Sequence, residues 1–117
     1  MLARKNRLSL TYNYQKLKNQ GKWLNLPLFN LLYSCRLGNK IPQVAIVAGT
    51  KVSPLSTKRH LVKRLISEAV RPALSSLPPN LSLAIFAKKE INDKNLTEIK
   101  NEWQKAIKQL NNETIKQ

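Results

Sequence analysis

The sequence predicts an α+β fold whose helices and strands follow one another in the order α-β-β-α-β-α. Apolar residues recur at helical spacing in three segments, and three shorter segments have the dense apolar and aromatic composition of buried strands. The 117 residues suffice for one hydrophobic core and hardly for two. Because no repeat or long linker interrupts the order, we expect a single domain over residues 1–117.

The first half of the chain predicts one helix and a pair of strands. Apolar and aromatic side chains recur at helical spacing over residues 8–17, and Gly21 follows as a stop signal. Residues 27–35 have strand composition, and residues 38–40, Gly-Asn-Lys, suit a hairpin turn. Residues 44–52 then form a returning strand, which we expect to pair antiparallel with the first.

A second helix is predicted to begin between residues 53 and 57. Ser53 and Ser56 can accept hydrogen bonds from free backbone N–H groups, and Pro54 suits a first helical position. Pro72 lacks an N–H donor and clashes with the preceding turn, so this helix ends or kinks near Arg71.

The last third of the chain predicts a buried strand and a closing helix. Residues 81–87 are almost continuously apolar, as in a strand buried on both faces. Asn95-Leu-Thr-Glu98 resembles a capping box that opens the helix. Either tryptophan could stack on bases, but Trp103 lies on the apolar face of this helix and is expected in the core, whereas for Trp23 the two possibilities stay open. The apolar face comprises Leu96, Ile99, Trp103, Ala106, Ile107 and Leu110.

The stretch TKRHLVKRLISEAVR, residues 57–71, separates into two faces at about 100° per residue. The polar face carries four permanent cations, which repel one another unless an anion lies against them. The wheel places Leu61 on the apolar side and predicts that it points to the core. The apolar face comprises Leu61, Val62, Leu65, Ile66, Ala69 and Val70; the polar face comprises Arg59, His60, Lys63, Arg64, Ser67 and Arg71.

The charge balance indicates a polyanionic partner. The chain has 21 Lys and Arg against 6 Asp and Glu, a formal net charge of +15. Nucleic acid, an anionic membrane and an acidic protein are the three candidates. Nucleic acid is favoured over a membrane because the apolar face of the basic helix is needed to cover the sheet. We expect no membrane segment and no signal peptide, and therefore a cytoplasmic protein.

The residues expected for catalysis or metal binding are missing. With one Cys and one His there is no zinc-type ligand set, and His60 has no nucleophile or carboxylate at an informative spacing. Cys35 is expected to be a small buried or half-buried hydrophobe in a strand. No catalytic residue and no protein-bound cofactor are therefore predicted, and another component should perform any chemistry.

The basic helix and its surroundings resemble the bacterial ribonuclease P protein family. The succession Lys51-Val-Ser, then Lys58-Arg-His-Leu-Val-Lys-Arg, then Glu68-Ala-Val-Arg71 is similar to the family signature. Asn6-Arg7-Leu8, Tyr14 and Gly21-Lys22 resemble its N-terminal pattern, and LSLAIFAKKE resembles its last strand. The resemblance covers about residues 4–110.

Several positions depart from the family pattern. Leu61 stands where a second Arg is usual, and Pro54 and Leu55 stand where Lys is frequent. Lys18 replaces a second aromatic residue of the first helix. These changes alter individual contacts within an otherwise similar motif.

The resemblance implies the protein subunit of a ribonucleoprotein endonuclease that hydrolytically removes the 5′ leader from precursor tRNA. The expected partners are ribonuclease P RNA, which would carry the catalysis and bring Mg²⁺, and precursor tRNA, with no further protein required. The fold implied is ribosomal protein S5 domain 2-like, with an uncommon left-handed βαβ crossover. The residues implied for contact with the catalytic RNA are Lys51, Lys58, Arg59, His60, Lys63, Arg64 and Arg71, and those for a leader-binding groove are Tyr14, Lys18, Lys22 and Tyr33.

Alternative functions remain open at this point. Another small basic RNA-binding protein, such as a ribosomal protein, would use the same helix on structured RNA without a single-strand groove. A membrane or acidic-protein adaptor and a self-sufficient nuclease are further alternatives, although the sequence contains no recognisable nuclease site.

Overall fold

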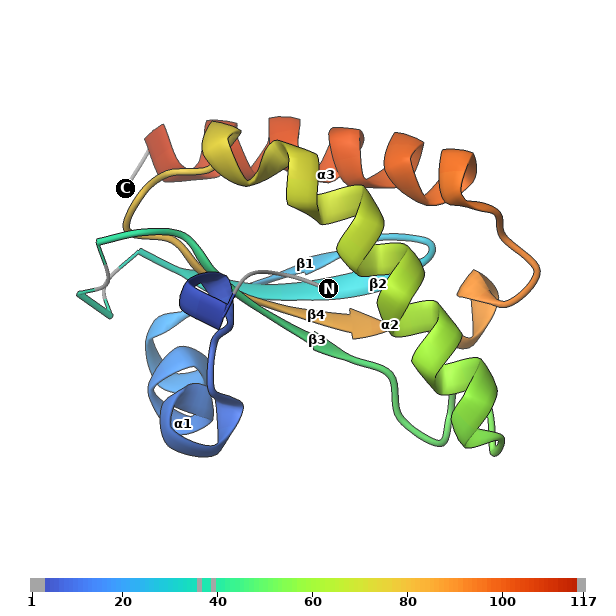
Figure 1. Cartoon of the computed structure of the whole chain (residues 1–117). Coiled ribbons are helices and arrows are strands. Elements are labelled where there is room, and N and C mark those ends of the chain that lie inside the picture. The colour runs from blue at the N-terminus through green and yellow to red at the C-terminus, as the bar shows by residue number, and fades with distance from the viewer. Residues whose placement is uncertain (1–3, 36, 39, 116–117) are drawn as a thin grey trace.

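A four-stranded sheet is covered by two helices on one face and by a single helix on the other (Figure 1). This computed structural model describes residues 4–35, 37–38 and 40–115. The strands are β1 (Lys22–Asn25), β2 (Phe29–Ser34), β3 (Gln43–Val47) and β4 (Ser82–Ala87). The α-helices are α1 (Leu10–Gln20), α2 (Ser56–Val70) and α3 (Leu96–Ile115), with short 3₁₀ turns at Arg4–Asn6, Arg71–Ser76 and Lys89–Ile91.

The strand order is β1-β2-β4-β3, which confirms the α+β class. β4 pairs antiparallel with β2 and parallel with β3, so it is a central strand. The β3-α2-β4 connection is left-handed, as the family resemblance implied and against the usual preference of such crossovers (Figure 1).

The predicted hairpin between residues 27–35 and 44–52 is wrong. β2 pairs instead with β1, a four-residue strand that the sequence pattern did not reveal, and β3 lies at the far edge of the sheet. The sequence of β1, KWLN, is too short and too polar to show strand periodicity. The apolar β4 needs a partner on each side, and its insertion between β2 and β3 separates the two strands that the turn chemistry had joined.

The helix boundaries agree closely with the signals read from the sequence. α1 ends at Gly21, whose N–H donates to the Leu17 carbonyl at 2.7 Å. α2 begins at Ser56 after Leu55, within the predicted range, but Pro54 precedes the helix and is not its first residue as predicted. Ser53 Oγ accepts from the Leu55 N–H at 3.1 Å within the preceding loop and does not cap the helix. Pro72 lies in the 3₁₀ turn that follows the helix. The predicted capping box opens α3, since the Asn95 N–H donates to Glu98 Oε2 at 3.1 Å and the Glu98 N–H donates to Asn95 Oδ1 at 2.9 Å.

Two apolar clusters hold the layers together, one on each face of the sheet. The larger cluster joins β2, β3 and β4 to α2 and α3 and contains Trp103, which confirms its predicted core position. Trp103 packs against Phe29 with ring centroids 6.4 Å apart. The smaller cluster attaches α1 to the opposite face through Leu8, Leu17, Leu32 and Ala84. Because α1 covers only part of that face, the remainder is available to form a site.

The junction between α1 and β1 generates a testable prediction. A Cβ on Gly21 would collide with the Leu17 carbonyl oxygen and lie 2.8 Å from that of Tyr33, both of them backbone atoms. Gly21→Ala should therefore lower the free energy of unfolding by about 1–3 kcal/mol in denaturant titration. Gly49→Ala is the control, because a Cβ there meets nothing within 4 Å, and it should change stability by at most about 0.5 kcal/mol. Equal stability of the two variants would contradict the close packing of α1 on the sheet.

Candidate nucleic-acid interface

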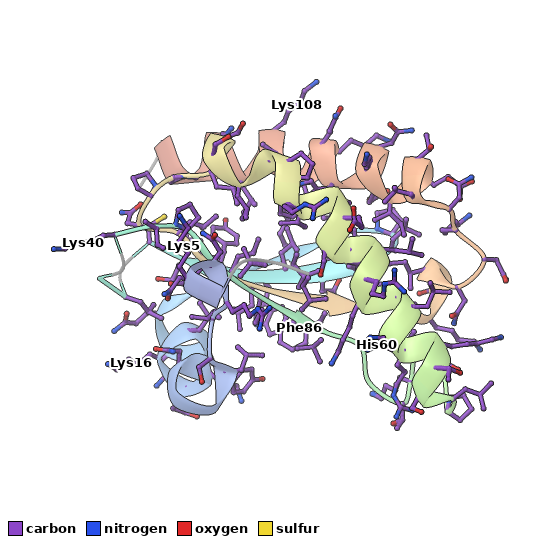
Figure 2. The ribbon with its side chains drawn as sticks, viewed as in Figure 1. Lys5, Lys16, Lys40, His60, Phe86 and Lys108 are labelled. Atoms are coloured by element: carbon purple, nitrogen blue, oxygen red, sulfur yellow. The ribbon has the colours of Figure 1, made fainter. Side chains whose placement is uncertain are left out.

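The outer surface of α2 presents most of the cations predicted to contact RNA. Lys58, His60, Arg64 and Arg71 are exposed, and Lys63 is partly covered. Figure 2 shows His60 near the N-terminal end of α2, away from the α3 layer. The buried side of the helix carries Val62, Ile66, Ala69 and Val70, so α2 combines a core face with a cationic face. Ser67 is also buried, contrary to the wheel, and its Oγ donates to the Lys63 carbonyl at 2.9 Å.

Two of the arginines predicted to contact RNA, Arg59 and Arg71, also make contacts within the protein. Arg59 Nη1 donates to the carbonyl oxygens of Ser53 and Pro54, at 3.1 and 3.0 Å, and so fastens the β3-α2 loop to the helix. Arg71 Nη2 lies 3.1 Å from Glu68 Oε2 in an exposed ion pair. Such a pair contributes little to stability in water and leaves the remaining guanidinium donors for other ligands.

Leu61 is not a core residue, contrary to the prediction from the helical wheel. Its side chain is 52% exposed, while the adjacent Val62 is buried. The N-terminal end of α2 extends past the sheet (Figure 1), so the apolar face is covered over a narrower arc there than along the rest of the helix. The position that usually holds Arg in the family therefore lies on the surface beside the cations.

A groove lies on the sheet face that α1 leaves uncovered. Its volume is about 840 Å³, and three aromatic rings line it: Tyr14 of α1, Trp23 of β1 and Phe86 of β4. The Trp23 and Phe86 centroids are 5.5 Å apart with planes at 41°, and Tyr14 meets Phe86 edge-on at 6.5 Å. Figure 2 shows Phe86 on the α1 side of the sheet, between α1 and the first turns of α2. Trp23 is 50% exposed, so its ring is available for stacking.

Lysines border this groove. Lys51, which the family resemblance implied for contact with the catalytic RNA, lines the groove together with Lys88 and Lys89 from the end of β4. Glu90 is the acidic residue among the lining side chains. Aromatic rings with lysines beside them form the combination that binds single-stranded nucleic acid, by stacking bases and neutralising phosphates.

Three of the four residues expected in the groove do not line it. Tyr33 is 2% exposed and belongs to the α2-α3 core. Lys22 pairs with Tyr33 across β1 and β2, so the pleat directs it to that same face, away from Trp23. Lys18 is exposed on α1 but is absent from the lining residues. Tyr14 is the one of the four that lines this groove, and its role in binding a leader stays a prediction.

Two lining aromatics were not among the residues expected for the groove. The position of Trp23, which the sequence left open, follows from the pairing of β1 with β2, because the register sets it beside Leu32. Phe86 could have been found from strand periodicity, since it alternates with the core residues Leu83 and Ile85 of β4.

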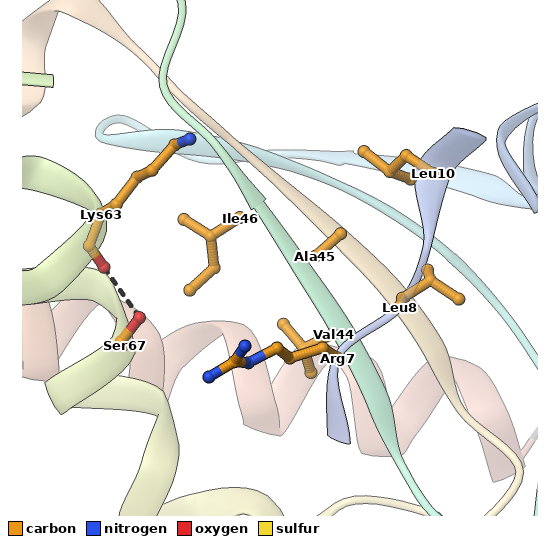
Figure 3. Close-up of a pocket in the computed structure, with 8 residues that line it drawn as sticks. All are labelled: Arg7, Leu8, Leu10, Val44, Ala45, Ile46, Lys63 and Ser67. Atoms are coloured by element: carbon orange, nitrogen blue, oxygen red, sulfur yellow. Dashed lines mark hydrogen bonds between the residues drawn. The ribbon is translucent and has the colours of Figure 1, made fainter. Parts of the chain in front are cut away.

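A smaller pocket of about 290 Å³ lies at the β3 edge of the sheet (Figure 3). Arg7 of the N-terminal segment and Lys63 of α2 both line it, over a floor that includes Ala45 and Ile46. The Leu8 N–H donates to the Val44 carbonyl at 3.0 Å and holds the N-terminal segment against β3. Cations from two distant parts of the sequence thus extend the basic surface of α2 toward α1.

The chemistry of the remaining candidate groups is limited. Burial raises the pKa of the Cys35 thiol, which disfavours the reactive thiolate. Among the described residues, no three His, Cys, Asp or Glu side chains gather as a metal site. The helices in the described part of the chain are also too short or too polar to cross a bilayer.

Comparisons with known proteins identify the family. No curated protein sequence matches the chain. The family model for ribonuclease P matches residues 2–111. The solved ribonuclease P protein from Thermotoga maritima is similar with a TM-score of 0.78 at 20% identity, over 88% of this chain and 96% of that one. A Staphylococcus aureus ribonuclease P protein mutant with defective mRNA degradation activity is similar with a TM-score of 0.79 at 16% identity, over 88% and 86% of the two chains. The structures show a shared fold, and the family model shows that this chain belongs to the ribonuclease P protein family.

Proposed function

We propose that this chain is the protein subunit of a bacterial ribonuclease P, which binds the catalytic RNA through α2 and the 5′ leader of precursor tRNA through the aromatic groove. The observation that supports it most directly is the position of the groove, beside the basic helix in a chain of this family. One surface of the protein can therefore face two RNA molecules, or two parts of one complex.

Contact with the catalytic RNA is assigned to α2 and the β3 edge. The residues that we propose for it are the exposed Lys58, His60, Arg64 and Arg71, with Lys63 beside them. Arg59 contributes mainly by fixing the loop from which α2 begins. Phosphates would relieve the mutual repulsion of these cations and release counterions, so binding should weaken as salt increases.

The leader is assigned to the groove. A single strand would stack bases on Trp23, Phe86 and Tyr14, while Lys51, Lys88 and Lys89 neutralise its phosphates. Such a groove favours precursor over mature tRNA because only the precursor carries the leader. The hydrolysis itself would be performed by the RNA, and Mg²⁺ would arrive bound to RNA phosphates.

A small ribosomal protein is the main alternative. It would use the basic helix as a clamp on structured RNA, for which an open groove with three aromatic rings has no use. The two functions are separated by asking whether the groove distinguishes an RNA with a single-stranded 5′ extension from the same RNA without it.

The basic face of α2 generates the first prediction. Lys58→Ala combined with Arg64→Ala removes two exposed cations, and the slope of log affinity against log salt for ribonuclease P RNA should fall by roughly 1 to 2. The matched control is Lys105→Ala combined with Lys108→Ala, which removes the same charge from exposed positions of α3, where Figure 2 shows Lys108 pointing away from the sheet. Filter binding over a salt series measures both. Equal slopes for the two double variants would refute α2 as the contact surface.

The exposed Leu61 generates a second prediction. Leu61→Arg should leave the unfolding temperature nearly unchanged, because the side chain is already on the surface, and should strengthen binding to ribonuclease P RNA with about one additional unit of salt slope. Leu61→Gln is the control, since it removes the apolar side chain without adding charge and should bind like the parent protein. A marked fall in stability of Leu61→Arg would show that the residue is buried after all.

The aromatic groove generates a third prediction. Trp23→Ala and Tyr14→Ala should each weaken binding of the reconstituted holoenzyme to leader-bearing precursor tRNA by about 1–3 kcal/mol, because each removes a stacking platform. Binding to mature tRNA should change little. Lys22→Ala, on the other face of the sheet, should have a smaller effect on both. If Trp23→Ala weakens both substrates equally, the leader does not occupy the groove.

A further inference from the structure

Trp103 of α3 has a buried donor that the fold does not satisfy. Its side chain is only 2% exposed, and its indole Nε1 has no hydrogen-bond partner in the described part of the chain. A buried N–H without a partner loses its hydration at a cost of about 1–3 kcal/mol, so native structures rarely keep one. The missing acceptor therefore has to come from a molecule other than this chain.

A pocket of about 360 Å³ adjoins Trp103, between α3 and the C-terminal end of α2. We call it the interhelical pocket. It belongs to the α2-α3 layer and so lies across the sheet from α1 and the aromatic groove (Figure 1). Its volume falls within the range of about 300–1,000 Å³ that is typical of small-molecule sites. The lining residues are Ala69, Pro72, Ala73 and Ser76 on one wall and Lys100, Trp103, Gln104 and Ile107 on the other.

The shape of the interhelical pocket follows from the spacing of these residues. Each wall contributes positions i, i+3, i+4 and i+7, which form one continuous face of a helical segment. Seven residues of α-helix rise by about 10 Å, so the pocket is elongated along the helices. Small side chains make up the α2 wall and leave room beside the indole ring.

The α3 wall combines an apolar surface with hydrogen-bond donors. Trp103 and Ile107 supply the apolar part, and the exposed side chains of Lys100 and Gln104 lie within one turn of Trp103. An indole N–H donates only, and an ammonium group has donors and no acceptor, so together they favour a ligand that accepts. Lys100 is also the one cation among the lining residues, which matches a ligand with a single negative charge.

The α2 wall can move to admit such a ligand. Beyond Val70 it consists of the 3₁₀ turn Arg71–Ser76, and none of the side chains of this turn is buried. Pro72 lacks the N–H that would continue the helical hydrogen bonds. Segments with few buried side chains open locally at low free-energy cost, so the turn can shift and uncover the indole N–H.

We propose that the interhelical pocket binds a small amphiphilic carboxylate, such as a fatty acid of medium length. The carboxylate accepts a hydrogen bond from Trp103 Nε1 and pairs with Lys100, and the hydrocarbon chain lies along Ala73 and Ile107. A hydrogen bond to a charged acceptor is stronger than one to a neutral acceptor, so the carboxylate satisfies the indole better than an amide or an alcohol would. This inference does not depend on the proposed contacts with RNA.

The test observes the indole proton during titration with octanoate. In a proton–nitrogen correlation spectrum each of the two tryptophans gives one indole resonance, and the resonance absent from Trp103→Phe belongs to Trp103. Octanoate should move the Trp103 proton downfield and leave the Trp23 proton in place. Octanamide, which has the same chain without the charge, should bind roughly 10-fold more weakly.

Variants separate the donor from the shape of the pocket. Replacing Trp103 by benzothienylalanine, in which sulfur takes the place of the N–H, should weaken octanoate roughly 10-fold without lowering the unfolding temperature, because only an unsatisfied group is lost. Lys100→Ala should weaken octanoate by about 2- to 5-fold and leave octanamide unchanged. Lys105→Ala is the control, an exposed cation of α3 outside the lining residues, and should change neither affinity.

Two outcomes would overturn the proposal. One is a Trp103 resonance that stays in place at millimolar octanoate, which would mean that water alone satisfies the indole. The other is equal affinity for octanoate in the parent protein and in the benzothienylalanine variant, because the N–H would then make no bond to the carboxylate.

Discussion

The pairing of β4 with both β2 and β3 is the interaction on which the rest of the molecule depends. It brings together three segments that are distant in the sequence, and it gives each strand of the sheet two defined faces. Side chains of one parity enter the α2-α3 core, as Leu83 and Ile85 do, and those of the other parity enter the α1 face, as Ala84 and Phe86 do. The aromatic groove exists because α1 covers the second face only in part. The position of every proposed RNA contact follows from this division.

α2 meets two opposite requirements with one helix. Its apolar side is needed to bury the sheet, and its other side concentrates like charges that cost free energy until an anion approaches. The loop before it is fixed by Arg59 and Ser53, so the cations start from a defined position rather than from a flexible arm. A preorganised basic surface loses less conformational entropy when it binds RNA.

Local signals in the sequence correctly predicted the features that nearby residues determine. The end of α1 at Gly21, the capping box of Asn95 and Glu98, and the core position of Trp103 all depend on nearby residues and were found in the structure. The pairing of strands depends instead on which distant segments bury their apolar side chains together. Turn chemistry alone therefore wrongly predicted a hairpin between β2 and β3. The register of β2 against its neighbours determines which face of the sheet Tyr33 lies on, since a shift by one residue moves every side chain of a strand to the opposite face. The predicted core position of Leu61 was wrong for a related reason, because a helical wheel does not show where the covering sheet ends.

In the proposed function, the chain contributes binding surfaces and the RNA performs the chemistry. Its central claim is tested most directly by reconstitution: the purified protein is added to a bacterial ribonuclease P RNA at low Mg²⁺, and the rate of 5′ leader cleavage from precursor tRNA is measured. The account predicts that the protein raises this rate strongly, that it cleaves nothing without the RNA, and that the gain is lost when Lys58, Arg64 and Trp23 are replaced by alanine. A rate unchanged by the protein, or cleavage by the protein alone, would contradict it.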